Sequence, residues 1–186
     1  MKNFTKGLFI LFSVILLIYL IWPGPNSIYL FKPLPSSVKS KLDGDVWQVP
    51  NIVAFFSNSY RTENVLFYSK DYQQLSRFFF SPIRINHPPE FAYTAIKPYT
   101  DSTYLEEFVY PLRDSLYVNG FEPFYEDGQS KYWGAIPFLV DGTNWQTKTT
   151  LRFHPSSVFA RIVLWFGISL SIYLLFIMTK RILKND

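Results

Sequence analysis

Two long apolar stretches, one near each end of the chain, are the strongest constraint on its fold. Residues 7–22 contain no charged side chain, and residues 158–178 contain a single one, Arg161. About 20 consecutive apolar residues are enough for a helix to cross a bilayer. The sequence therefore predicts two transmembrane helices, at residues 7–22 and 158–178, in an integral membrane protein surrounded by lipid. We expect Arg161, about one turn inside the second helix, to extend its charge to the membrane interface.

The first stretch also has the pattern of a cleavable signal peptide, because Lys2 and Lys6 precede it. Signal peptidase sites have small residues in an A-x-A arrangement, whereas Pro23, Gly24 and Pro25 follow this stretch. The sequence therefore favours an uncleaved signal anchor over a cleaved secretory signal.

Basic residues flank both stretches and lie in short terminal segments: Lys2, Lys6, Lys180, Arg181 and Lys184. Short basic segments of this kind stay on the cytoplasmic side of a membrane. We therefore expect residues 1–6 and 179–186 in the cytoplasm, and residues 23–157 as an extracytoplasmic domain at the cell membrane.

The net charge of +4 belongs to the membrane flanks and not to the domain between them. Residues 24–157 contain twelve Lys and Arg against thirteen Asp and Glu. A nucleic-acid surface needs clustered positive charge, so the sequence predicts no nucleic-acid partner. The chain has no cysteine, which excludes disulfides, thiol nucleophiles and cysteine-bound metals.

The middle domain is predicted to be α+β, with about three helices followed by an antiparallel β-meander. Helices are expected at residues 59–79, where apolar residues recur every three or four positions, at 88–98 and at 103–119. In the third helix, Thr103 and Glu106 form a capping box. Earlier in the domain the sequence predicts a surface linker at residues 26–35, a helical turn at 36–42 and a strand around 46–49.

After residue 121 the apolar pattern changes to a period of two, which is typical of strands. Asp127-Gly128 and Asp141-Gly142 are turn sequences between these strands. We predict that residues 145–153 pair with residues 132–140 through the second turn.

The alternation within residues 145–153 also predicts which side chains are buried. Trp145, Leu151 and Phe153 fall on one side of the strand, and Thr150 and Arg152 on the other. We expect the Leu151 side to be buried and the Thr150 side to face solvent.

No sequence motif fixes a reaction. The chain has no glycine-rich phosphate loop, nucleophile elbow or zinc-protease motif. His87 and His154, the only histidines, fall in different elements, so no metal site and no cofactor is expected. Glu106 is expected to cap a helix, and Glu107, Glu122 and Glu126 to be solvated surface charges. No catalytic residue is predicted.

The aromatic content, 20% of the chain, is the most unusual part of the composition. Tyrosine and tryptophan combine a flat apolar ring with a polar atom, which suits partner and ligand surfaces as well as cores. Tyr132 and Trp133, beside Gly134, and Trp145, just after a turn, are the candidate partner-binding or ligand-binding residues.

Three function classes remain open. The sequence favours a membrane-anchored envelope protein whose domain binds a protein partner or organises a complex without catalysis. The alternative is a small enzyme or binder acting on envelope glycan, with acids drawn from the four glutamates named above. A second alternative is a sensory domain that signals through a separate membrane partner, because residues 179–186 are too short for a signalling domain.

Overall fold

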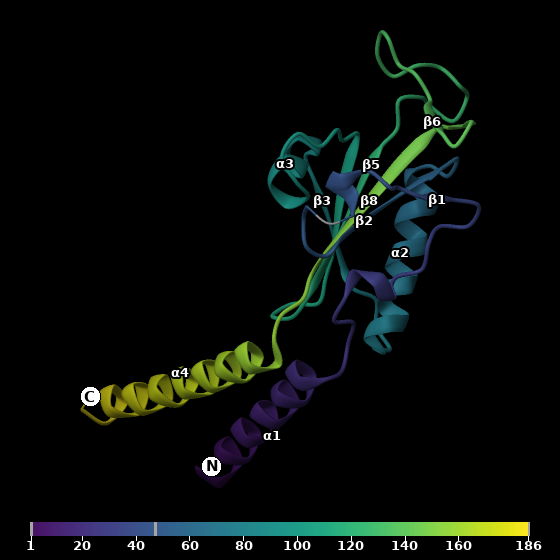
Figure 1. The fold of residues 1–186 in the computed structure, drawn as a ribbon. Helices are drawn as coiled ribbons and strands as arrows, with labels where there is room; N and C mark the ends of the chain where they lie inside the picture. The colour runs from purple at the N-terminus through teal and green to yellow at the C-terminus, as the bar shows by residue number, and fades with distance from the viewer. Residues whose placement is uncertain (1, 47, 186) are drawn as a thin grey trace. The chain divides into compact units, whose positions relative to one another are not determined.

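The computed structural model describes residues 2–46 and 48–185 (Figure 1). The chain divides into two compact units. One contains the two end segments, up to Pro23 and from Ser156 onward, and the other is the domain Gly24–Pro155.

The end segments form two helices, α1 (Lys2–Ile21) and α4 (Val158–Asn185). Residues Val158–Ile182 of α4 are long and apolar enough to cross a membrane. The apolar part of α1, Thr5–Ile21, is shorter. The structure thus agrees with the second predicted transmembrane helix, while the first is not confirmed as a span.

Polar side chains join α1 and α4. The Trp165 indole nitrogen donates a hydrogen bond to the carbonyl of Ser13 at 2.9 Å, and the hydroxyl groups of Ser13 and Ser169 lie 3.1 Å apart. That Arg161 extends its charge to the membrane interface stays a prediction. Its guanidinium is buried and donates to the carbonyl oxygens of Leu20 and Ser156, because the last turn of α1 leaves acceptors unpaired within its own helix.

The domain contains a six-stranded antiparallel sheet in the order β1-β2-β8-β5-β4-β3. The domain is therefore α+β, as predicted. The strands of this sheet are β1 (Val38–Lys39), β2 (Ile52–Ser57), β3 (Ile83–His87), β4 (Tyr104–Val109), β5 (Ser115–Phe121) and β8 (Thr147–His154).

Helix α2 (Arg61–Ser76) covers the first face of this sheet (Figure 1). Its buried Tyr68 and Tyr72 pack in one cluster with Leu151 and Phe153 of β8. The predicted helix at 59–79 is confirmed in its central part, because the recurring apolar residues form the buried side of α2.

The second face is covered by a short helical segment, η3 (Pro89–Phe91) followed by α3 (Ala92–Ala95), on the opposite side from α2 (Figure 1). Ala92 and Ile96 pack there against Ile52 of β2 and Leu105 of β4. The predicted helix at 88–98 is thus present in shortened form.

The predicted helix at 103–119 is wrong, because these residues form the hairpin of β4 and β5. Tyr104, Leu105 and Phe108 of β4 are all buried, since the sheet is covered on both faces. A strand with two buried faces does not alternate between apolar and polar residues, so its apolar spacing resembles that of a helix. Pro111 lies in the turn between the strands, where it interrupts no hydrogen-bond ladder.

The predictions for the start of the domain are also corrected. Residues 26–35 are not a surface linker, because Ile28, Phe31 and Leu34 are part of the main core, with Ile28–Leu30 forming the 3₁₀ helix η1. Strand β1 replaces the helical turn expected at 36–42. In the range 46–49, Trp47 lies outside the described residues and the others form a turn; the strand begins at Ile52.

Strand β8 does not pair with residues 132–140. It lies between β2 and β5, where Leu151 is paired with Val53 and Val118. The Asp141-Gly142 turn instead joins two short strands, β6 (Phe138–Val140) and β7 (Thr143–Trp145). Because β8 is central, Thr150 is only 2% exposed, and the expectation that it faces solvent is wrong.

Candidate functional site

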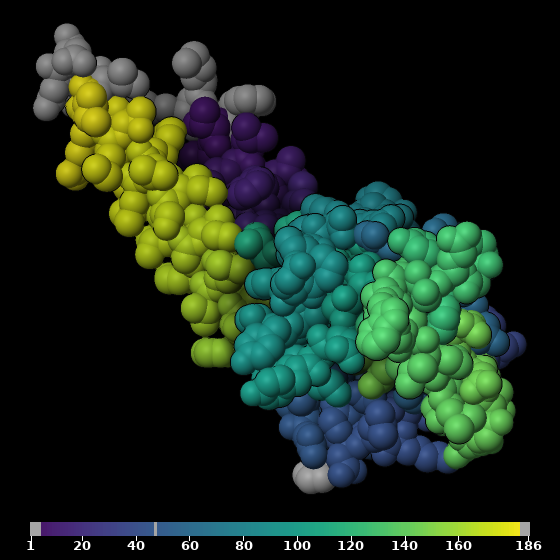
Figure 2. Space-filling model, turned by 90° about the horizontal axis from the view of Figure 1, so that it is seen from above, coloured from purple at the N-terminus to yellow at the C-terminus, as the bar shows by residue number. Residues whose placement is uncertain are grey.

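Residues 122–145, which we call the extension, leave the sheet after β5 and return to it at β8. They rise beyond the end of the sheet in Figure 1 and form a raised surface, coloured green, in Figure 2. The extension contains β6 and β7 and an isolated bridge between Phe124 and Ser130.

The two predicted turns fix the backbone of the extension. At the first, Gly128 has a φ of 84°, and Tyr125 N–H donates to the carbonyl of Gln129 at 2.8 Å. At the second, Asp141 and Gly142 have φ angles of 49° and 77°, the combination of a hairpin turn with two left-handed residues. Asp-Gly is suited to this turn because Asp and Gly tolerate a left-handed backbone, which β-branched residues disfavour.

Aromatic rings attach the extension to the sheet. Phe138 of β6 packs against Phe56 of β2 and Phe121 of β5, with ring centroids 5.4 and 5.8 Å apart. Tyr132 stacks on Phe121 at 6.2 Å, with an interplanar angle of 16°. Part of the aromatic surplus therefore holds the extension in place.

The three candidate residues of the extension have different environments. Trp133 is fully exposed, at 100%, and Tyr132 keeps one ring face in solvent. Trp145 lies in β7 opposite Phe138, and its indole nitrogen is buried without a hydrogen-bond partner among the described residues. Two further apolar side chains of the extension, Ile136 and Leu139, are mostly exposed.

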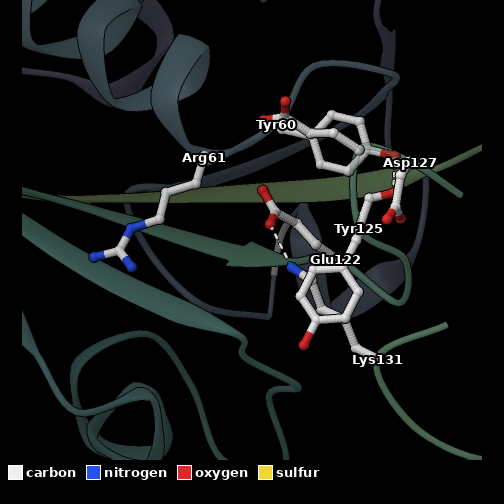
Figure 3. Close-up of a pocket in the computed structure, with 7 residues that line it drawn as sticks. Tyr60, Arg61, Glu122, Tyr125, Asp127 and Lys131 are labelled. Carbon is white, nitrogen blue, oxygen red and sulfur yellow. Dashed lines mark hydrogen bonds and ion pairs between the residues drawn. The ribbon is translucent and has the colours of Figure 1, made fainter. Parts of the chain in front are cut away.

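An acidic pocket of about 400 Å³ lies at the base of the extension (Figure 3). Glu122 Oε2 accepts a hydrogen bond from Lys131 Nζ at 2.8 Å. Its other oxygen, Oε1, is buried and has no partner within the described part of the chain. The remaining lining residues are Tyr60, Arg61, Tyr125, Glu126 and Asp127.

The negative charges of the pocket affect Tyr60. Burial, and then the charges of Glu122, Glu126 and Asp127, raise the pKa of its hydroxyl, so the group stays protonated as a donor. It donates to the carbonyl of Tyr125 at 3.2 Å. The tyrosine thereby links the start of α2 to the extension.

Arg61 lines the pocket, but Figure 3 shows its guanidinium directed away from Glu122. It donates instead to Glu106, which also accepts hydrogen bonds from Arg84 at 2.7 and 2.9 Å. Burial alone would raise the pKa of Glu106, but the hydrogen bonds and charges of Arg84 and Arg61 outweigh it and lower the pKa. Glu106 is therefore a buried ion-pair residue of β4 and not a helix cap.

The four glutamates considered in the sequence do not converge. Glu106 and Glu107 are neighbours in a strand and point to opposite faces of the sheet. Glu107 Oε2 lies 2.8 Å from His87 Nε2. Glu122 and Glu126 line the same pocket, so they are the only two of the four that the fold brings together.

The two histidines lie near one aromatic ring. His87 and His154 have ring centroids 5.9 and 5.4 Å from that of Tyr117. Burial, followed by the charge of Glu107, raises the pKa of Tyr117 to about 12, and burial lowers the pKa of His154. In the residues that the structure describes, no three His, Asp or Glu side chains are grouped to hold a metal ion.

Sequence reasoning did not find Tyr60 or Lys131 as parts of a site. Position 60 is far along the chain from positions 122 and 131, and no local pattern links them. The turn sequence Asp127-Gly128 was the one available signal, because a turn there brings Lys131 back toward Glu122.

Comparisons of the chain with protein-family models, with curated proteins and with solved structures gave no match.

Proposed function

We propose that the domain Gly24–Pro155 is held at a membrane by α1 and α4 and binds a protein partner through the exposed side of the extension, without catalysis. The observation that carries this proposal is the full exposure of Trp133 on a segment whose turns are hydrogen-bonded. Tryptophan is the residue most enriched among binding hot spots. A ring with no packing role in its own fold is available to a partner.

The membrane part of the proposal rests on α4 and on its contacts with α1. Helix α4 meets the length needed for a span. The hydrogen bonds of Ser13 with Trp165 and Ser169 are of the kind that joins helices inside a bilayer. We propose that α1 crosses the membrane beside α4, with both termini in the cytoplasm and the domain outside the cell membrane.

Topology is tested by cysteine labelling, for which the chain is suited because it has no cysteine of its own. A cysteine replacing Gly128 should react with an impermeant maleimide in intact cells, and one replacing Asn185 should react only after permeabilisation. The reverse pattern would contradict the proposed orientation. Labelling of both positions in intact cells would contradict the pair of spans.

Partner binding is tested with a photo-crosslinking amino acid at position 133 in cells, using position 79 as the matched control. Phe79 is 95% exposed and lies outside the extension. A discrete adduct is expected from position 133 and none from position 79, and Trp133→Ala should abolish co-purification of that adduct's protein. Adducts from both positions, or from neither, would reject the proposal.

One observation favours a second candidate, a binder of envelope glycan at the acidic pocket. Sugar hydroxyls are donors, and Glu122 offers a buried acceptor between Tyr60 and Tyr125, whose rings can pack on a sugar. Glu122→Gln would abolish glycan binding in this case and leave the adduct at position 133 intact. Loss of cellular activity in Glu122→Gln with the adduct unchanged would replace the first candidate by the second.

A further inference from the structure

A second pocket, distinct from the acidic one, opens on the second face of the sheet. It has a volume of about 250 Å³, and its floor is formed by β2, β8 and β5. In the strand register, Phe56, Lys148 and Phe121 form one row across the floor, and Thr150 and Asn119 are neighbours in the next row. We call it the sheet pocket. Its volume lies below the usual range for drug-sized ligands, so it suits a small metabolite.

Two lysine side chains line this pocket and share one carboxylate. Lys97 Nζ lies 2.6 Å from Asp45 Oδ1, and Lys148 Nζ lies 2.7 Å from Asp45 Oδ2. Asp45 is fully buried and also accepts a hydrogen bond from Ser40 at 2.6 Å. One carboxylate neutralises one ammonium group, so the cluster of Asp45 and the two lysines carries one positive charge beside the pocket.

The lysines retain hydrogen-bonding capacity. An ammonium group has three donors, and Lys97 uses two of them, toward Asp45 and the carbonyl of Gly44. Each lysine side chain is 18% exposed, so its charge is largely removed from water. Such a pair is prepared to bind a carboxylate of a ligand.

Two residues of the same lining, Asn119 and Thr100, carry buried oxygen atoms without partners among the described residues. Asn119 is 1% exposed, and its Oδ1 is buried with no hydrogen-bond partner in the described structure, although its amide nitrogen donates to the carbonyl of Asp101. The Thr100 hydroxyl is also buried and unpartnered among the described residues. Asp101 adds a carboxylate to the lining. Buried polar atoms are rarely left without a partner, so these atoms indicate a ligand that carries a donor.

Aromatic side chains form much of the remaining lining, with Phe138 packed against both Phe56 and Phe121, and with Tyr99 exposed. The backbone of Tyr99 has a φ of 57°, a left-handed conformation that is uncommon for a bulky residue and is found at binding sites. This lining suits an apolar body on the ligand.

We propose that the sheet pocket binds a small organic acid that carries an amino or hydroxyl donor and an apolar body, as an amino acid or a hydroxy acid does. The carboxylate contacts Lys97 and Lys148, the donor group contacts Asn119 Oδ1 and the Thr100 hydroxyl, and the body packs on the phenylalanine rings. Phe138 of the extension lines this site, but the site uses neither the exposed Trp133 nor a protein partner, so it stands or fails separately from the proposed function.

Calorimetric titration of the full chain in detergent tests the proposal with four matched compounds. Phenylalanine and phenyllactate have all three features, 3-phenylpropionate lacks the donor, and phenethylamine lacks the carboxylate. We expect the first two to bind, 3-phenylpropionate to bind about five-fold more weakly, and phenethylamine not to bind. No binding of the first two, or equal heats from all four compounds, would overturn the proposal.

Variants separate the site from a structural role of the lysines. Thr100→Val removes an unpartnered hydroxyl. It should weaken the binding of phenyllactate about five-fold and leave the binding of 3-phenylpropionate unchanged. Lys148→Met should abolish binding of both acids, while Glu126→Gln, in the acidic pocket, should change neither. Unchanged binding in Thr100→Val and Lys148→Met would place the ligand elsewhere and overturn the assignment.

Discussion

The first face of the sheet is covered by α2 and packed with aromatic rings and aliphatic side chains. The second face is covered by α3 only around the row of Ile52, Arg152 and Tyr117. Two side-chain rows further along, at Lys148, the second face opens into the sheet pocket. The same strand, β8, therefore contributes core residues on one side and pocket residues on the other. The difference shows that a strand can be fully buried and still serve two purposes, stability through one face and binding through the other.

The largest effect is expected from comparing the two sides of β8 directly. Leu151→Asp places a charge in the apolar cluster under α2 and should destabilise the domain by about 4 kcal/mol or more. Thr150→Asp places the same charge in the pocket with Lys148 and should destabilise it by about 1–2 kcal/mol. Urea unfolding of the full chain in detergent, followed by near-UV circular dichroism, measures both. Equal losses would show that the two faces are equivalent.

A smaller loss of stability is expected from a substitution at Gly120 of β5, which faces the side of the sheet covered by α2. A Cβ atom there would lie 2.0 Å from Tyr104 Cε1, and the Tyr104 ring is buried between the sheet and α2. Gly120→Ala should therefore destabilise the domain by about 2–3 kcal/mol, measured by the same unfolding experiment. Gly128→Ala is the control, because its Cβ would meet no atom within 4 Å and only the backbone at φ 84° is strained, worth about 1 kcal/mol. A larger loss in the control would contradict the steric explanation.

The buried acids of the two faces, Glu106 and Asp45, both have lowered pKa values. For Asp45, burial alone would raise the pKa, but hydrogen bonds from Lys148, Lys97 and Ser40 outweigh it. A carboxyl group whose pKa is lower in the folded chain than in the unfolded chain stabilises the fold at pH values above its unfolded pKa. This stabilisation is lost as the pH falls through its folded pKa. Unfolding free energy should therefore begin to fall below about pH 6.5, where burial opposes protonation of His154, and fall further below about pH 4 as the two acids are protonated.

Replacing each acid by its amide should remove part of this acid dependence and also reveal how the faces differ. Asp45→Asn leaves two lysines that are 18% exposed, and should destabilise the domain by about 2 kcal/mol at pH 7. Glu106→Gln leaves Arg61 and Arg84, which are 40% and 51% exposed, so solvent screening reduces the loss to about 1 kcal/mol. Titration of unfolding free energy between pH 3 and 7 measures both variants. If the unfolding free energy of a variant falls with decreasing pH as steeply as that of the unmodified chain, other groups control the acid dependence.

The smallest effect is expected at Thr100. Because its hydroxyl has no partner within the described residues, Thr100→Val should change the unfolding free energy by less than about 0.5 kcal/mol. Thr147→Val is the matched control on the first face, since the Thr147 hydroxyl is buried and donates to the carbonyls of Ser57 and Ser59 at 3.0 and 2.9 Å. That variant should lose about 1–2 kcal/mol. Equal losses in thermal unfolding would mean that Thr100 has a structural partner.

Residues whose structure depends on near neighbours in the chain were predictable from the sequence. The apolar spacing of three and four residues predicted α2, the long apolar stretch predicted α4, and the Asp-Gly pairs predicted both turns of the extension. Each of these features depends on contacts within a few positions, through helix periodicity or through a left-handed backbone that Gly and Asp tolerate. For the same reason Trp133 was found as a candidate, because it lies beside Gly134 in a polar turn region.

Only the tertiary structure decided the pairing of strands and the composition of both pockets. Residues 103–119 form a hairpin that the sequence did not reveal. Because β4 and β5 are covered on both faces, they lack the alternation of apolar and polar residues by which a strand is recognised. Strand β8 joined β2 and β5, separated from it by about 90 and 30 residues, instead of the nearby residues 132–140. Asp45, Lys97 and Lys148 meet for the same reason: strand order and the covering segments set which distant side chains share a space, and local sequence patterns carry no information about that order.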